Sequence, residues 1–246
     1  MRMQPRMKAM ILAAGRGERM RPLTDTCPKP LLRVHGKPLV EWHVEALARA
    51  GVIDIVINTA WLEAMLVEAL GDGSRFGVRI SYSMEGRDHG GALETAGGIA
   101  KALPLLADAS GGGDDDPFWL VSADIYAPEF AFDPATAARF EAGSDVAHVW
   151  LVPNPDFHAK GDFGLDAQGR GLDSAGADGR TWTYANLALL RPALVRHIAS
   201  GTRAALGPLL YSAMRERRIG AEGYAGEWHN LGTPAQLDAL NRSRSP

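Results

Sequence analysis

With 246 residues, the chain has room for one large α/β domain or two small ones, and one domain is the simpler interpretation. Hydrophobic residues make up 46% of the chain and no apolar run approaches the roughly 20 residues of a membrane span, so we expect a soluble protein with no membrane partner. The net charge is −3, with acidic and basic residues interspersed. This argues against a nucleic-acid partner, because no basic stripe is present to follow a phosphate backbone.

The N-terminus and the cysteine content bear on the location of the protein. Residues 1–7 are basic but are followed by no apolar segment with a cleavage site, so we predict a short extension rather than a signal peptide. The domain is then predicted to cover residues 8–246. The single cysteine, Cys27, excludes an internal disulfide and is typical of a reducing environment. We therefore expect a cytoplasmic protein.

The first half of the chain alternates between apolar runs and helical patterns. Residues 10–14 and 52–58 are apolar runs typical of buried strands, and residues 38–50 carry apolar side chains at helical spacing. A strand, a helix and a second strand in this order imply parallel pairing, so we predict an α/β, Rossmann-like, doubly wound and mostly parallel sheet with helices on both faces. The pattern continues with a helix at 62–70, a strand at 78–83, a helix at 95–103 and a strand at 118–123.

The second half continues without an internal repeat or a linker. Before it, the segment 110–116 has the sequence SGGGDDD, which predicts a solvated surface loop. Its aspartates are not a predicted metal site, because a flexible loop cannot hold a fixed coordination geometry. The remaining predicted elements are strands at 146–152 and 181–190, a stretch rich in glycine and aspartate at 161–179, and helices at 206–217 and 235–241.

A glycine-rich segment follows the first predicted strand. Gly15 and Gly17 allow the backbone to approach a triphosphate closely, with its amide groups acting as an anion nest. Arg19 and Lys29 add positive charge. The segment lacks the third glycine of a dinucleotide-binding fingerprint and the G-K-[ST] ending of a Walker loop. It is therefore predicted to be a phosphate site of another kind.

Asp124 directly follows the strand predicted at 118–123. Ligands of doubly wound sheets bind beyond the carboxyl ends of the strands, so we expect Gly15 and Asp124 to face one cleft. A carboxylate in this position suits Mg²⁺, which binds through one or two carboxylates together with substrate phosphates and water. Asp124 is therefore a predicted magnesium ligand.

The segment 12–31 closely resembles the signature of the sugar-phosphate nucleotidyltransferases, G-x-G-x-R-[LM]-x-P-L-T followed by P-K-P. The resemblance implies that Arg19 contacts the leaving phosphates of an NTP and that Lys29 stabilises the α-phosphate. For Arg16 and Arg21, a ligand contact and simple solvation both stay open. The resemblance further implies that the nucleotide is held by the loop residues Leu12, Ala13, Ala14, Gly15 and Gly17.

A second match lies at the start of the helix predicted at 95–103. Glu94, Thr95 and Gly97 resemble the family segment that selects the nucleobase. Hydroxyl and backbone groups there can bond to a base edge, and glycine lets a flat ring stack closely. The same residue types are also ordinary for a helix N-terminus, so this interpretation has a plain structural alternative.

Asn230 is the largest departure from the family pattern. In the segment 228–234 the family commonly has an aspartate at this position, and that aspartate is the second metal ligand. An amide oxygen can still coordinate Mg²⁺ but brings no negative charge, so we expect weaker binding or a water-mediated contact.

The stretch 152–165 narrows the resemblance. It looks like the N-P-x-x-H…G-D-F-x-L stretch of the N-acetylmuramate 1-phosphate uridylyltransferases, and residues 183–186 resemble the later sugar-binding strand of that group. Insertions at 87–91 and 110–115 interrupt the match. The resemblance implies that the sugar phosphate is bound by Asn154, Gly161, Asp162 and Asn186.

By this resemblance, residues 8–125 form the nucleotide-binding half and residues 126–246 the sugar-phosphate-binding half of one domain. The implied reaction is Mg²⁺-assisted transfer of UMP from UTP to N-acetylmuramate 1-phosphate, with release of pyrophosphate, as in recycling of the peptidoglycan cell wall. One alternative is a thymidylyl- or uridylyltransferase acting on glucose 1-phosphate with dTTP or UTP. Another is a nucleotide-binding regulatory protein without turnover, with which Asn230 is consistent. The sequence leaves the oligomeric state open.

Overall fold

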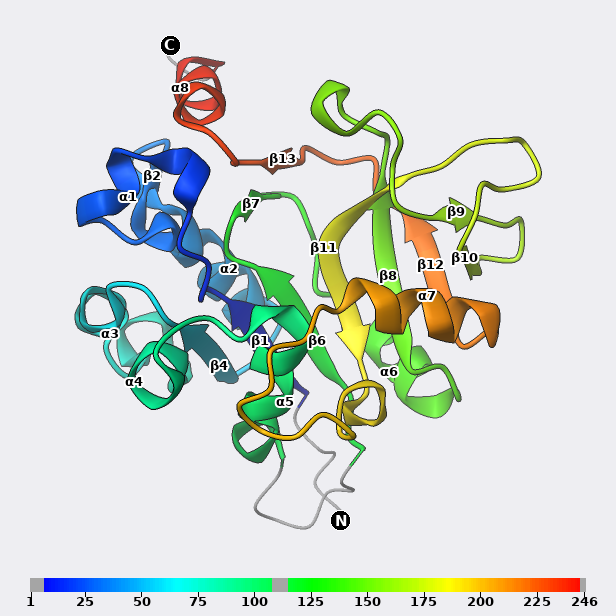
Figure 1. The fold of residues 1–246 in the computed structure, drawn as a ribbon, viewed down its shortest axis with the longest axis horizontal. Coiled ribbons are helices and arrows are strands. Elements are labelled where there is room, and N and C mark those ends of the chain that lie inside the picture. Colours follow the sequence, from blue (N-terminus) through cyan, green and yellow to red (C-terminus); the bar gives the residue numbers. More distant parts are fainter. Residues whose placement is uncertain (1–6, 108–114, 244–246) are drawn as a thin grey trace.

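The computed structural model describes residues 7–107 and 115–243 (Figure 1). The predicted extension at 1–7 and the predicted loop at 110–116 lie largely outside the described residues. At the centre of the fold is a seven-stranded sheet in the order β12-β8-β11-β6-β1-β4-β5. Its strands are β1 (Lys8–Leu12), β4 (Asp54–Thr59), β5 (Arg79–Met84), β6 (Phe118–Ser122), β8 (Ala147–Val152), β11 (Thr183–Leu190) and β12 (Ile219–Gly223).

The sheet is mostly parallel, as predicted. Strand β1 pairs in parallel with β4 and β6, β4 pairs in parallel with β5, and β12 pairs in parallel with β8. Strand β11 runs antiparallel to both of its neighbours, β6 and β8. Helix α2 (Leu39–Arg49) provides the crossover from β1 to β4 that a parallel pair requires. The α/β class and the parallel pairing of the first two predicted strands are confirmed.

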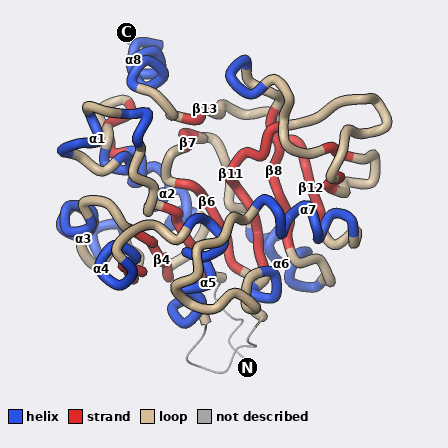
Figure 2. Tube along the Cα trace, viewed as in Figure 1, coloured by secondary structure: helices blue, strands red, loops and turns tan. Residues whose placement is uncertain are grey.

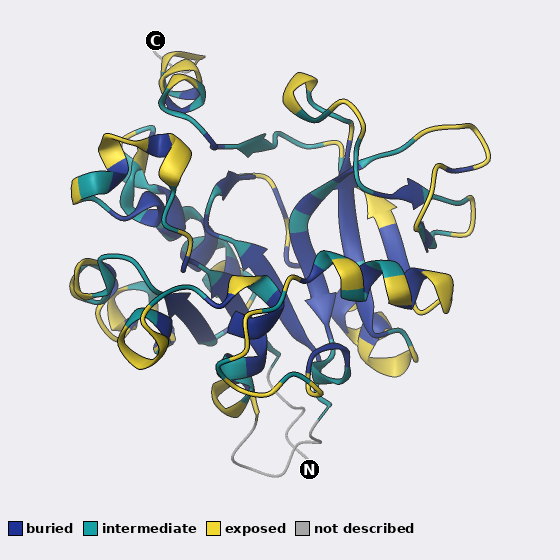
Figure 3. Cartoon of the chain, viewed as in Figure 1, coloured by how far each residue is buried: buried dark blue, intermediate teal, exposed yellow. Residues whose placement is uncertain are grey.

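Helices cover both faces of the sheet. Side chains of α2, α3 (Glu63–Leu70) and α6 (Pro134–Ala142) share one core with alternate residues of β1. Those of α5 (Glu94–Leu106) and α7 (Gly207–Arg215) share a second core with Met10, which points to the other face. Figure 2 shows α5 and α7 in front of the strands, and Figure 3 shows that the strands at the centre of the sheet are largely buried. No helix within the described residues is long and apolar enough to cross a membrane.

Smaller elements complete the fold around this sheet. Helix α8 (Pro234–Ser243) packs through Leu237 and Leu240 against Tyr126 and Met20, next to the loop that follows β1. The others are α1 (Leu23–Thr26), α4 (Glu85–His89), β2 (Arg33–Val34), β3 (Lys37–Pro38), β7 (Ile125–Tyr126), β9 (Gly164–Leu165), β10 (Gly171–Leu172) and β13 (His229–Asn230).

Several elements differ from the predicted ones. The first strand ends at Leu12 rather than at residue 14, because the Ala13 amide donates its hydrogen bond to Asn58 Oδ1 (2.8 Å) instead of to a neighbouring strand. Neither β12 nor α6 is predicted from the sequence pattern. Strand β12 has the sequence IGAEG, whose small residues give no apolar strand pattern. The glycine at 220 is required by packing, because a Cβ there would lie 2.6 Å from Nδ1 of His148.

His43 connects helix α2 to the segment that follows β6. Its buried ring contacts the carbonyl oxygen of Ile125 at 2.8 Å through Nε2, and because a carbonyl only accepts, Nε2 carries the proton. Burial lowers the pKa of His43 to about 4, against the opposite effects of this hydrogen bond and of the Asp124 carboxylate. The neutral ring therefore holds the backbone just after Asp124.

We predict that the free energy of unfolding falls as the pH is lowered from 6.5 to about 4. In this window the unfolded chain protonates His43 and the folded chain does not, so stability is lost at up to about 1.4 kcal/mol per pH unit, or about 3 kcal/mol in all. Above pH 6.5 the ring is neutral in both states and its contribution is constant. Denaturant titrations at stepped pH measure the slope. The variant His43→Asn still offers an N–H donor, now from its side-chain amide, but cannot ionise. If the unfolding free energy of this variant falls just as steeply with pH, His43 is not the source of the effect.

Candidate functional site

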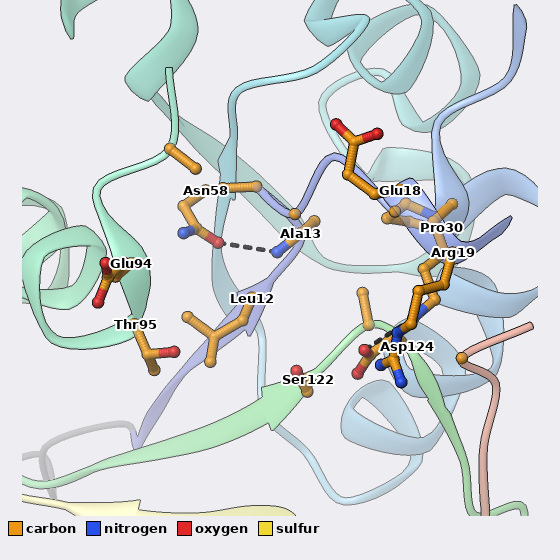
Figure 4. Close-up of a pocket in the computed structure, with 17 residues that line it drawn as sticks. Leu12, Ala13, Glu18, Arg19, Pro30, Asn58, Glu94, Thr95, Ser122 and Asp124 are labelled. Carbon is orange, nitrogen blue, oxygen red and sulfur yellow. Dashed lines mark hydrogen bonds and ion pairs between the residues drawn. The ribbon is translucent and has the colours of Figure 1, made fainter. Parts of the chain in front are cut away.

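A cavity of about 360 Å³ lies at the carboxyl ends of the parallel strands (Figure 4). The strand register explains its position. Leu12 of β1 pairs with Asn58 of β4 on one side and with Ser122 of β6 on the other, so these three residues form one row at the edge of the sheet, and all three line the cavity. The predicted site residues that line it are Leu12, Ala13, Ala14, Gly15, Gly17, Arg19, Lys29, Glu94, Thr95 and Asp124.

The loop after β1 is fixed by contacts within itself. Gly17 has a φ of 69°, in the left-handed region that favours glycine. A Cβ there would lie 3.0 Å from Cγ2 of Thr24, whose hydroxyl donates a hydrogen bond to the Gly17 carbonyl at 2.8 Å. At Gly15, in contrast, no described atom beyond its chain neighbours lies within 4 Å of the position that a Cβ would take. The loop is therefore rigid at Gly17 and open at Gly15, where a ligand can approach the backbone.

Arg19 differs from the other arginines of this loop. Arg16 donates to the Thr24 carbonyl at 2.9 Å, and both Arg16 and Arg21 form ion pairs with Asp25, at 3.3 and 2.8 Å. Neither of them lines the cavity. The exposed Arg19 side chain has no hydrogen bond or ion pair within the part of the chain that the structure describes. Its guanidinium is therefore available to an anion.

Lys29 and Asp124 are paired across the cavity. The Lys29 ammonium lies 2.8 Å from Oδ2 of Asp124, and the Lys29 side chain is only 10% exposed, compared with 36% for Asp124. The pair joins the glycine loop to the end of β6, over 95 residues of sequence. Each group neutralises the other in this state, so an anion that attracts Lys29 would release the carboxylate of Asp124.

Asn230 is brought directly beside Asp124. Strand β13 pairs with β7 so that Asn230 lies opposite Ile125, and the amide of Leu231 donates to the Asp124 carbonyl at 3.0 Å. Oδ1 of Asn230 is buried and has no hydrogen-bond partner among the described residues. The backbones of Asn230 and Asp124 are therefore neighbours, and an amide oxygen without a partner together with a carboxylate makes a donor set that suits a hard cation such as Mg²⁺. No cluster of three His, Cys, Asp or Glu side chains occurs in the described ranges.

A second cavity, of about 640 Å³, adjoins the first. It lies on the side of β11 and α7, and it includes Asp162, Asn186 and Asn230. Arg19 lines both cavities. The other shared residues are Leu12, Glu94, Thr95 and Ser122. Two ligands could therefore meet at one shared wall that carries a free guanidinium.

Asp162 and Asn186 reach the second cavity in different ways. The Asp162 carboxylate accepts hydrogen bonds from the Tyr184 amide at 2.9 Å and contacts the His158 ring at 3.0 Å, so its orientation is fixed. Asn186 has a φ of 58° and stands where the pairing of β11 with β8 shifts register between Tyr184 and Ala188. Such an irregularity re-aims a side chain, and asparagine tolerates the left-handed backbone better than most residues.

Three predicted site residues line neither cavity. Asn154 donates to the Thr181 carbonyl at 3.1 Å, and Gly161, with a φ of 61°, leaves room for it: a Cβ there would lie 2.5 Å from Asn154 Oδ1. Gly97 packs on the segment 202–204, where a Cβ would lie 2.2 Å from the Thr202 carbonyl oxygen. The structure therefore places Asn154, Gly161 and Gly97 behind the walls of the site, in contacts that shape it.

Asn58 is the main cavity residue that the sequence pattern does not single out. Asn58 is 2% exposed and lines the first cavity, and its side chain accepts a hydrogen bond from the Ala13 amide. The one available signal is its position, because it is a polar residue at the carboxyl end of a predicted buried strand. The second cavity also includes Tyr184, which lies in the segment 183–186 and whose hydroxyl is buried without a hydrogen-bond partner among the described residues.

Comparison with known proteins gives relatives for this arrangement. A family model described as nucleotidyl transferase matches residues 8–170. The N-acetylmuramate alpha-1-phosphate uridylyltransferase of Neisseria meningitidis serogroup B is 46% identical over 238 residues, which cover 94% of this chain and 95% of that protein. The glucose-1-phosphate thymidylyltransferase of Streptomyces griseus is 29% identical over 247 residues, covering 96% of this chain and 65% of that protein.

A solved structure shows the same fold. A Bacillus anthracis protein assigned as a glucose-1-phosphate thymidylyltransferase, determined with sucrose bound, superposes with a TM-score of 0.79. The superposition covers 96% of this chain and 94% of that one, at 20% identity. At this identity the likeness supports the fold alone.

The different surroundings of two glycines give a test of the site geometry. We predict that Gly97→Ala lowers the free energy of unfolding by about 1–3 kcal/mol, because the new methyl group meets backbone that cannot move aside easily. Gly15→Ala serves as the matched control and should change it by less than about 1 kcal/mol, because its methyl group enters open space. Chemical denaturation measures both. Equal stability of the two variants would show that Gly97 is not packed as described.

Proposed function

This chain belongs to the nucleotidyl transferase family, and we propose that it transfers UMP from UTP to N-acetylmuramate 1-phosphate, forming a UDP-sugar and pyrophosphate. As a family member it is a sugar 1-phosphate nucleotidyltransferase. The observation that carries the reaction is the pair of adjoining cavities with Arg19 in their shared wall, because transfer between two substrates requires two sites that meet. The choice of uridylyl and muramate rests on the 46% identity to the Neisseria meningitidis enzyme over almost the whole chain.

The proposed reaction is one in-line displacement. A phosphate oxygen of the sugar 1-phosphate forms a bond to the α-phosphorus of UTP, and the bond from that phosphorus to the bridging oxygen of the β-phosphate breaks, so that pyrophosphate leaves. A phosphate monoester is largely ionised at neutral pH, so the attacking oxygen needs no general base. The tasks of the protein are alignment and charge stabilisation.

Three side chains divide these tasks in the proposal. Arg19 binds the leaving β- and γ-phosphates, for which its unpaired guanidinium at the junction of the cavities is suited. Lys29 turns from Asp124 to the α-phosphate, where it stabilises the charge that develops during transfer. The distance of 2.8 Å between Lys29 and Asp124 means that this exchange replaces one ion pair by another within the same buried site.

We propose Mg²⁺ as the cofactor, with the Asp124 carboxylate and Oδ1 of Asn230 as its protein ligands. The unsatisfied, buried oxygen of Asn230 fits this role, and the remaining ligands would come from phosphate oxygens and water. When bound, the metal supplies positive charge that offsets the charge of the triphosphate. The amide adds no negative charge, so we expect the metal to be held more by the nucleotide than by the protein.

The two cavities support a division of the chain into two halves. We propose that residues 8–125 bind the nucleotide and residues 126–246 the sugar phosphate within one domain. The first cavity is lined almost wholly from the first half, and the second adds residues such as Asp162 and Asn186 from the second half. A muramate acceptor would make the reaction part of peptidoglycan recycling, and the supply of UTP would place it in the cytoplasm.

The acceptor is tested by measuring pyrophosphate release with UTP or dTTP, Mg²⁺ and one of two sugars. We predict that N-acetylmuramate 1-phosphate with UTP gives the highest kcat/KM. The 29% identity to the Streptomyces griseus thymidylyltransferase makes glucose 1-phosphate the competing acceptor. Preference for glucose 1-phosphate would overturn the proposed substrate and leave the family reaction in place, and absence of release with either sugar would overturn the proposed reaction.

The roles of the central pair are tested by Lys29→Ala and Asp124→Ala. We predict that each lowers kcat about 10²- to 10³-fold, the usual cost of losing a preorganised charge at the reacting centre. Lys37→Ala is the matched control: it removes an ion pair of similar geometry, 2.6 Å from Glu45, that lines neither cavity. Steady-state kinetics on folded variants measures the effect. Turnover near the parent value in either test variant contradicts its role.

A further inference from the structure

Two buried side chains connect the glycine loop to the start of helix α5. The Ala13 amide donates to Oδ1 of Asn58 at 2.8 Å, and Nδ2 of Asn58 donates to Oε1 of Glu85 at 2.6 Å. The other carboxylate oxygen, Oε2, accepts a hydrogen bond from the Leu93 amide at 2.8 Å. Glu85 has 0% exposure and Asn58 has 2%. We call this series of three hydrogen bonds the Asn58–Glu85 link.

The Asn58–Glu85 link spans one end of the first cavity. Figure 4 shows Asn58, Glu94 and Thr95 at the end away from Arg19 and Asp124. The phosphates belong at the end with the charged side chains, so the linked end is where the nucleobase lies in the proposed complex. One wall there is the backbone of the loop after β1, and the opposite wall is the first turn of α5. The link ties these two walls together.

The chemistry of the link requires a carboxylate at position 85. Nδ2 of Asn58 and the Leu93 amide both donate to Glu85, each to a different oxygen. Only a carboxylate has an acceptor oxygen for each of these two donors. A glutamine has one oxygen, so its NH₂ group would face one of the two donors in a buried place. Burial raises the pKa of Glu85, while both hydrogen bonds and the charges of Lys101 and His89 act to lower it.

Gly98 adds independent support. A Cβ at this position would lie 2.5 Å from Oε1 of Glu85 and 2.8 Å from Nδ2 of Asn58. The absence of a side chain on this turn of α5 is therefore what allows the helix to pack directly on the link. Gly97 and Gly98 consequently have separate tasks, since Gly97 faces the segment 202–204.

We propose that Asn58 and Glu85 are positioning residues that hold the base end of the donor cavity at a fixed width and thereby set its affinity for UTP. This inference rests on the proposed function for the identity of the nucleotide. Neither residue takes part in the displacement, so the link acts on donor binding and leaves the acceptor cavity unchanged.

The first test is Glu85→Gln, which keeps shape and removes one acceptor. An unsatisfied buried donor weakens the wall, and we expect the Kd and KM for UTP to rise about 10-fold or more, with kcat and the acceptor KM within about threefold of the parent. The control is Glu63→Gln. Glu63 also accepts two backbone amides, of Gly86 and Arg87 at 3.0 Å each. Unlike Asn58, which bonds to Glu85 and lines the first cavity, neither of these partners lines it, so this variant should keep the parent Kd for UTP.

The second test exchanges the two functional groups. In the double variant Asn58→Asp with Glu85→Gln, the aspartate accepts from the Ala13 amide and from the glutamine NH₂, and the glutamine oxygen accepts from the Leu93 amide, so all three hydrogen bonds return. We expect a Kd for UTP within about threefold of the parent. The double variant also tests the proposal if Glu85→Gln alone does not fold. A UTP affinity about 10-fold or more below that of the parent in the double variant overturns the proposal.

Calorimetric titration with UTP separates this proposal from the proposed function, because it needs no turnover. A parent protein that binds UTP without forming product with either sugar fails the proposed reaction, while its variants still report on the link. Unchanged UTP affinity in Glu85→Gln overturns the link as a positioning device. Absence of UTP binding by the parent protein overturns both.

Discussion

The parallel pairing of β1 with both β4 and β6 is the constraint on which the site depends. It puts Leu12, Asn58 and Ser122 in one row at the carboxyl edge of the sheet, although they are far apart in the sequence. From this row the loop after β1 turns over the cavity, and Asp124 follows directly after β6. Parallel strands need a crossover on one face or the other, so helices and cores on both sides follow from the same pairing.

Two features dominate the electrostatics at this edge of the sheet: the ion pair of Lys29 with Asp124, and the guanidinium of Arg19, which has no ion pair among the described residues. Lys29 and Asp124 neutralise each other, so the largely buried Lys29 ammonium carries no unbalanced charge. Arg19 stands at the more exposed junction of the cavities, where solvent lowers the cost of an unpaired guanidinium. A triphosphate with its cation would replace the internal pair by two external ones. The site thus avoids both a buried free charge and a large rearrangement on binding.

The second cavity is built on different principles from the first. Strand β11 runs against its neighbours, and the register shift between Tyr184 and Ala188 exposes Asn186 to the second cavity. The Thr183 hydroxyl donates to Asn154 and the Tyr184 amide donates to Asp162, and these two hydrogen bonds hold the long segment between β8 and β11 against this strand. Irregular backbone of this kind lets one fold vary one cavity while the parallel edge and the loop after β1 stay the same.

The sequence by itself determined the α/β class, the parallel order of the first strands and the glycine loop, because apolar periodicity and glycine placement act locally. It also predicted that Gly15 and Asp124 face one cleft, since the carboxyl ends of parallel strands share an edge. Tertiary structure alone decided the pairing of Lys29 with Asp124, the link through Asn58 and the position of Asn230, because each depends on segments brought together from distant parts of the chain. It also decided that Gly97 serves packing, since glycine looks the same in a sequence whether a ligand or a backbone approaches it.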